Sequence, residues 1–140
     1  MRKIFDASAI MLLTKNHPTE AVEHLKDQLL LDLTIYELGN AIWKINKLLK
    51  KPDNKTALES IEQVHDLTAL MKTHVAQNRQ THIAIMENAF QCNLTYYDSA
   101  YLTTAQQEGY TLVTEDRQLQ KAANAASTNT IDTDTLIATT

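Results

Sequence analysis

The sequence has 140 residues, of which 44% are hydrophobic, enough for one compact domain with a buried core. No apolar run reaches the length of a membrane span, and the charged start MRKIFD does not resemble a signal peptide, so we expect no membrane association. The net charge of −4 indicates no general nucleic-acid-binding surface, but it is compatible with an enzyme that has a local acidic site.

Cysteine and histidine usage argues against disulfide and zinc chemistry. Cys92 is the only cysteine, so no internal disulfide framework can form, and a lone thiol is compatible with a reducing cytosol. None of the five histidines pairs with Cys92 at the spacing of zinc ligands. We therefore expect a cytoplasmic protein. Its two glycines and two prolines predict regular structure with short connections.

The amino-terminal part of the chain predicts alternating strands and helices. The expected elements are a strand at 2–5, a helix at 7–15, a helix beginning at Pro18 and a buried strand at 29–33, the run LLLDL. A long helix then begins at Thr34, with apolar residues such as Leu38 and Ile42 at helical spacing, and Pro52 ends it.

The remaining part begins with a long helical region and then returns to alternation. Residues 54–77 have amphipathic spacing, as one helix or two, and 80–91 predict another helix. The run LTYY, 94–97, predicts a strand, and the helix that follows is stopped at Gly109 by a left-handed cap. The last expected elements are a strand at 110–114, a helix at 117–126, a weaker strand at 128–132 and a polar tail.

Strands that alternate with helices predict an α/β fold in which a short, mostly parallel sheet carries helices on both faces. The sequence contains no repeat and no linker, which predicts a single domain over residues 1–140. Ligands of such sheets bind at the carboxyl ends of the strands. The residues that follow each predicted strand are therefore the candidates for a functional site.

Four carboxylates lie at or just beyond predicted strand ends. Asp6 follows KIF, Glu37 follows LLLDLT by three residues, Asp98 follows LTYY and Asp116 follows TLVT by two. In a parallel sheet all four would point toward one edge. The other acidic residues lie on helix faces, in connections or near the tail, and are best interpreted as solvated surface.

Each of these acids also has an ordinary structural explanation. Asp6, Asp98 and Asp116 are suitable helix N-caps. The run from Thr34 to Glu37 fits a capping box, in which the glutamate reaches back to the Thr34 amide. Four negative charges that converge on one edge repel one another, however, and Ser or Asn would serve equally well as caps. The set as a whole is therefore better explained by cations among the oxygens.

Carboxylates and water suit Mg²⁺ or Mn²⁺ better than zinc. A metal held there would polarise a phosphoryl oxygen and lower the pKa of a bound water. The sequence has no Ser–His–Asp arrangement and no glycine-rich phosphate loop. The metal is therefore the most plausible source of the nucleophile.

The ordered set of motifs resembles the PIN-domain ribonucleases, specifically the small VapC-type toxins of prokaryotic toxin–antitoxin pairs. The matching stretches are KIFDASAI, LTIYELGNAIWK, LTYYDSAYLTTAQQEGYTLVTEDRQL and the weak last strand, and together they cover nearly the whole chain. The resemblance implies a PIN-like three-layer α/β/α fold. It also implies metal-dependent endonucleolytic cleavage of RNA that leaves a 5′-phosphate and a 3′-hydroxyl.

The resemblance assigns roles to individual residues. Asp6, Glu37, Asp98 and Asp116 match the four acids of the family and would carry catalysis and bind the metal. Three supporting residues match smaller polar positions of the family, namely Ser8, Asn40 and Thr114. Ser8 and Asn40 are equally well explained as ordinary helix residues, and Thr114 as a strand residue. Arg117, next to Asp116, is a candidate for contact with RNA phosphates.

The sequence also leads to expectations about binding partners and alternative functions. We expect a cognate antitoxin that blocks the site, and a homodimer formed through apolar residues at 29–31 and the helix at 35–49. Receiver domains and haloacid-dehalogenase-like phosphatases also place Asp after strands, but the paired acids, the Asp-x-Asp motif and the terminal Lys that they need are missing here. A catalytically inactive PIN-like scaffold or protein-binding module is the non-enzymatic alternative.

Overall fold

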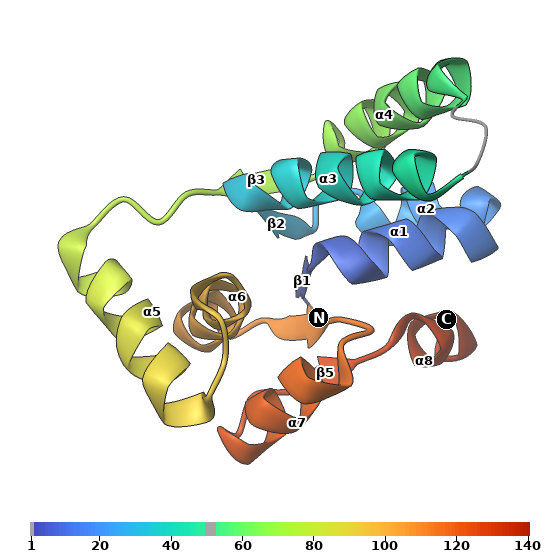
Figure 1. The fold of residues 1–140 in the computed structure, drawn as a ribbon. Coiled ribbons are helices and arrows are strands. Elements are labelled where there is room, and N and C mark those ends of the chain that lie inside the picture. The colour runs from blue at the N-terminus through green and yellow to red at the C-terminus, as the bar shows by residue number, and fades with distance from the viewer. Residues whose placement is uncertain (1, 50–52) are drawn as a thin grey trace.

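A computed structural model of the chain describes residues 2–49 and 53–140. Its strands are β1 (Lys3–Phe5), β2 (Leu29–Leu31), β3 (Lys72–His74), β4 (Thr111–Val113) and β5 (Thr130–Ile131). Its helices are α1 (Ala7–Asn16), α2 (Pro18–Leu25), α3 (Asp32–Leu48), α4 (Asn54–Thr68), α5 (Arg79–Cys92), α6 (Tyr96–Glu108), α7 (Arg117–Ala125) and α8 (Thr133–Ala138). Figure 1 shows how they surround the sheet.

The sheet has the order β3-β2-β1-β4-β5, and all four of its strand pairs are parallel. The strands are only two or three residues long, so a few register pairs determine how the sheet is aligned. Ile4 pairs with Leu112, and Phe5 pairs with Val113. The predicted α/β class with a short parallel sheet is confirmed.

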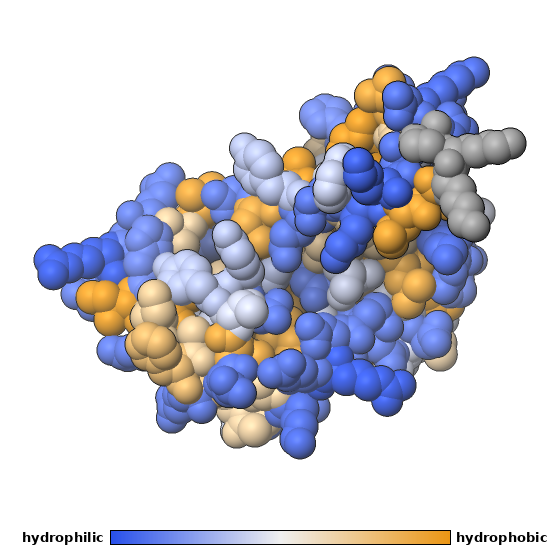
Figure 2. All heavy atoms as spheres, viewed as in Figure 1, coloured by the Kyte–Doolittle hydropathy of each residue, from blue (hydrophilic) through white to orange (hydrophobic). Residues whose placement is uncertain are grey.

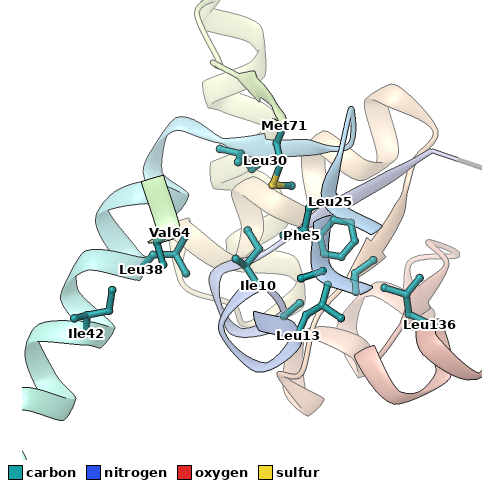
Figure 3. Packing of buried hydrophobic residues seen from close by; sticks show 13 residues of the cluster. Phe5, Ile10, Leu13, Leu25, Leu30, Leu38, Ile42, Val64, Met71 and Leu136 are labelled. Atoms are coloured by element: carbon teal, nitrogen blue, oxygen red, sulfur yellow. The ribbon is translucent and has the colours of Figure 1, made fainter. Parts of the chain in front are cut away.

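The alternation of side chains along the strands divides the core into two clusters. Phe5, Leu30 and Val113 face one side, where they pack with residues of α1, α2, α3, α4 and α8 (Figure 3). Ile4, Leu112 and Leu31 face the other side, where they pack with residues of α5, α6 and α7. Helices therefore cover both faces of the sheet, as βα alternation requires.

The strand predicted at 94–97 is wrong. Tyr96 and Tyr97 form the first turn of α6, and Thr95 caps that helix by accepting a hydrogen bond from the Asp98 amide at 3.1 Å. Aromatic residues favour strands only where a sheet buries them. Tyr97 is exposed, so this preference had no packing to support it. The predicted end of α6 is confirmed, because Gly109 is its left-handed cap with φ 70°.

The capping box at Thr34 is also wrong. Helix α3 begins at Asp32, so Thr34 lies inside its first turn, and its Oγ1 accepts from the Leu31 amide at 3.1 Å. Asp32 and the following leucine, predicted as the end of a strand, belong to the helix. Glu37 is consequently free of any capping role and makes a tertiary contact instead.

Two short elements differ from the prediction because their sequences carry weak signals. Residues 54–77 contain not only α4 but also β3, an edge strand with the polar sequence KTH. The polar tail forms α8, which Asp132 caps and Leu136 anchors in the core. The predicted helix end at Pro52 lies outside the described residues.

The leucines at 29–31 form β2 and are buried in the sheet, so the prediction that they form part of a dimer interface is wrong. Helix α3 nevertheless exposes Tyr36, Trp43 and Leu48. Figure 2 shows hydrophobic atoms on the surface in the region where α3 and α4 lie. The homodimer itself stays a prediction. Within the described residues, no helix combines the length and apolarity needed to cross a membrane.

Helix α3 offers a matched test of the core. Leu38 is 0% exposed and packs in the first cluster, whereas Leu48, on the same helix, is 78% exposed. We expect Leu38→Ala to lower the free energy of unfolding by about 2–5 kcal/mol, because it leaves a cavity. Leu48→Ala should change it by less than about 0.5 kcal/mol. Urea unfolding at low protein concentration measures both, and equal losses would contradict the assigned face of α3.

Candidate active site

The candidate site lies where the strand order reverses. Strands β1, β2 and β3 proceed in one direction from the centre of the sheet, and β4 and β5 proceed in the other. Parallel sheets bind ligands at the carboxyl ends of strands beside such a switch point. Asp6 directly follows β1, and its amide donates to the Val113 carbonyl at 3.2 Å. The register thus brings Asp6 beside Thr114.

The Asp6 carboxylate is buried and accepts hydrogen bonds at both oxygens. Oδ1 accepts from Ser8 Oγ at 2.7 Å and from the Ala9 amide at 2.9 Å. Oδ2 accepts from Thr114 Oγ1. Asp6 is therefore the N-cap of α1, as its ordinary explanation predicted, and it is also joined to the end of β4. Ser8 and Thr114 both contact an acid of the predicted set.

The loop after β4 is tied to the same group of residues. The Asp116 amide donates to Thr114 Oγ1 at 3.0 Å, and the Glu115 amide donates to Ser8 Oγ at 3.1 Å. Asp116 caps α7, because its Oδ1 accepts from the amides of Gln118 at 2.9 Å and Leu119 at 3.1 Å. One carboxylate oxygen of Asp116 is thus fixed by the helix start.

Glu37 lies in the second turn of α3 and reaches α6. Tyr101 Oη donates to Glu37 Oε1 at 2.6 Å and lies 2.7 Å from Thr34 Oγ1. The prediction from sequence missed Tyr101. The available signal was its spacing, because Tyr101 is three residues after Asp98 and so lies on the same face of α6.

Asp98 is the third residue of α6, not its cap, and is half-buried. Its carboxylate is therefore not needed to begin the helix, since Thr95 performs that task. A negative charge in the first turn is favourable toward the helix dipole. That effect explains an acidic residue there, but it does not explain a partly buried one beside other acids.

The pKa values of three acids are raised, with burial as the largest cause in each case. The nearby charge of Asp98 further raises the pKa of Asp6, and the charges of Asp6 and Asp98 further raise the pKa of Glu37. The charge of Asp116 further raises the pKa of Asp98. Hydrogen bonds oppose these shifts at each group. The four acids therefore interact electrostatically.

Burial, followed by the Glu37 charge, raises the pKa of the Tyr101 hydroxyl far above its usual range. Tyr101 consequently remains a hydrogen-bond donor wherever the protein is folded. In residues 2–49 and 53–140, no three His, Cys, Asp or Glu side chains form a group arranged to hold a metal ion. The charges of the acids therefore affect one another's pKa values, although no three of the described carboxylates are already arranged around one metal position.

Two predicted supporting residues, Asn40 and Arg117, make no hydrogen bond to the acids within the described residues. Asn40 lies exposed on α3, and within the part of the chain that the structure describes it has no hydrogen bond to the acids. Arg117 is the first residue of α7 and is exposed, and its charge helps to lower the pKa of Asp132, behind the two hydrogen bonds from Thr135. Arg117 thus interacts with the start of α8.

Comparison with known proteins places the chain in a family. The PIN domain family matches residues 3–125. The protein called exonuclease VapC9 of Pyrobaculum aerophilum is 31% identical over 134 residues, covering 96% of this chain and 92% of that protein. Ribonuclease VapC3 of the same organism is 30% identical over 130 residues, covering 85% of this chain and 92% of that protein.

Solved structures give the same placement. The crystal structure of PAE2754 from Pyrobaculum aerophilum superposes with a TM-score of 0.77 at 30% identity, covering 99% of this chain and 95% of that chain. The structure of VapBC-1 from nontypeable Haemophilus influenzae shares the fold, with a TM-score of 0.64 at 17% identity over 94% of this chain and 98% of that chain. The predicted resemblance is confirmed, and this chain belongs to the PIN domain family, among its VapC proteins.

Proposed function

We propose that this protein is a metal-dependent endoribonuclease and the toxin of a VapBC-type toxin–antitoxin pair, formed by residues 1–140 as one domain. The observation that carries the proposal is the group of Asp6, Glu37 and Asp98, whose pKa values are raised by burial and by neighbouring negative charge. Such a group holds unfavourable electrostatic energy that a bound cation would relieve. Membership among the VapC proteins supports nuclease chemistry.

The donor chemistry fits Mg²⁺ or Mn²⁺, because Asp6, Glu37, Asp98 and Asp116 offer only oxygen ligands. When bound, the metal would activate water and neutralise a phosphodiester. The chain's own residues prepare the oxygens. Ser8 and Thr114 hold the Asp6 carboxylate, and the first amides of α7 hold one oxygen of Asp116.

Two of the four acids are also helix caps, and two are not. Asp6 and Asp116 each combine a capping role with the charge, which fixes them to α1 and α7. Glu37 and Asp98 are not caps, so no helix start requires their carboxylates. This difference favours an active enzyme over a catalytically inactive scaffold, for which neither charge would be needed.

Endonuclease and exonuclease remain separate alternatives, since one relative is called an exonuclease and the other a ribonuclease. We propose the endonuclease, with RNA as substrate and a cytoplasmic location.

We further propose a homodimer through exposed apolar residues of α3, including Trp43. For the antitoxin we propose a helix in the groove of about 350 Å³ between α1, α3 and α4, where Ile42, Ile45 and Leu49 give an apolar lining, with a further segment that covers the acids.

A circular single-stranded RNA tests the cleavage mode and the metal together. We expect the protein to linearise the circle in Mg²⁺ or Mn²⁺, which an exonuclease cannot do because a circle has no end. It should be inactive in excess chelator, because the metal activates the attacking water. Asp116→Asn is the matched control, since Asn caps a helix as well as Asp but is a neutral ligand. It should abolish cleavage without unfolding the protein. Linearisation that persists in chelator would rule out the metal mechanism.

Asp98→Asn separates a metal ligand from a structural residue. We expect cleavage to collapse, metal-free melting temperature to hold or rise because one repelling charge is gone, and stabilisation by added Mn²⁺ to shrink. Asp134→Asn makes the same change in the first turn of α8, where the side chain is exposed. That control should leave cleavage and the Mn²⁺ effect unchanged. If Asp98→Asn behaves like it, Asp98 is not part of the site.

A further inference from the structure

Tyr101 connects α6 to Glu37, one of the two acids that have no capping role. Its hydroxyl donates to Glu37 Oε1 at 2.6 Å, across 64 positions of sequence, and its own helix carries Asp98. The side chain is 0% exposed and packs in the second core cluster, so the ring itself is immobilised. A hydroxyl on a fixed ring defines one position for the oxygen that accepts from it.

The direction of the hydrogen bonds follows from the number of protons. Tyr101 has a single hydroxyl proton and gives it to Glu37, so the Thr34 hydroxyl must donate to Tyr101 at 2.7 Å. Thr34 Oγ1 in turn accepts from the Leu31 amide at 3.1 Å. The chain of donors thus begins at a backbone amide where β2 passes into α3, and it ends on the Glu37 carboxylate.

This chain leaves one oxygen of Glu37 available. Tyr101 engages Oε1, and residues 2–49 and 53–140 supply no hydrogen-bond donor to Oε2. A glutamate side chain has three rotatable bonds and would otherwise sample several directions. Holding one oxygen therefore aims the other.

We propose that Tyr101, supported by Thr34, is a positioning residue that orients Glu37 for the divalent metal of the proposed nuclease. The inference rests on that proposed function, because it needs a metal at the acids. Removing a residue that orients a metal ligand typically lowers metal affinity or activity by about 10- to 100-fold. Tyr101 makes no contact with the substrate in this account and acts only through Glu37.

Tyr101→Phe removes the hydroxyl alone and tests the role by metal binding and by activity. We expect the Mn²⁺ concentration that gives half of the maximal rise in melting temperature to increase about 10- to 100-fold, with a matching loss of cleavage at low Mn²⁺. Tyr110→Phe is the matched control, since its hydroxyl contacts Arg2 at 3.4 Å before β4 begins. It should bind Mn²⁺ as the wild type does. Thr34→Ser should retain the effect of the hydroxyl, and Thr34→Val should lose it.

A double variant distinguishes positioning from a structural role. In a Glu37→Ala background, Tyr101→Phe should produce no further loss of Mn²⁺ affinity, because the group through which it acts is gone. The same further loss in both backgrounds, or wild-type Mn²⁺ affinity in folded Tyr101→Phe, would overturn the inference and leave the proposed function intact. If the wild-type protein shows no Mn²⁺ effect at all, the proposed metal site and this inference both fall.

Discussion

The burial of the Asp6 carboxylate is the constraint on which the rest of the site depends. A buried carboxylate is costly unless hydrogen bonds replace its water. Asp6 obtains them from the Ala9 amide in the first turn of α1, from the Ser8 hydroxyl two residues along and from Thr114 at the end of β4. These bonds join α1 to the loop that leads into α7. The hydrogen bonds that the buried Asp6 carboxylate requires therefore also fix the start of α1 relative to the start of α7.

The parallel sheet makes this arrangement possible with very little backbone. The pairing of Phe5 with Val113 aligns the ends of β1 and β4, so the residues that follow both strands meet without any long loop. The two remaining acids arrive on helices instead. Glu37 is held by the hydroxyl of Tyr101, and Asp98 lies one turn before that tyrosine. The site is thus assembled from two strand ends and two helices that the core holds rigidly.

Features that neighbouring residues determine could be predicted from the sequence, and features that depend on tertiary packing could not. Asp6 and Asp116 were placed correctly because each follows an apolar strand and begins a helix. Asp98 was assigned to a strand end because LTYY resembles a strand, although Thr95 begins a helix there. The strand β3 is polar and lies at an edge, so it carries no apolar signal. The bond from Tyr101 to Glu37 depends on tertiary packing across 64 positions, which no local pattern encodes.

Glu37 is a carboxylate that is partly buried among other negative charges, so its contribution to the free energy of unfolding depends on pH. Burial, and after it the charges of Asp6 and Asp98, raise the pKa of folded Glu37 above its ordinary value of 4.5. Glu37 therefore stabilises the fold fully below that value, and the stabilisation is lost as pH rises through the folded pKa. The measurement is the free energy of unfolding of wild type and Glu37→Gln without metal, from about pH 5 to about pH 8. The variant should gain stability relative to the wild type as pH rises, and saturating Mn²⁺ should reverse the order at the higher pH. A wild type that instead loses stability relative to the variant as pH falls would show that the fold stabilises Glu37 as an anion, and would contradict a carboxylate whose charge is unfavourable without metal.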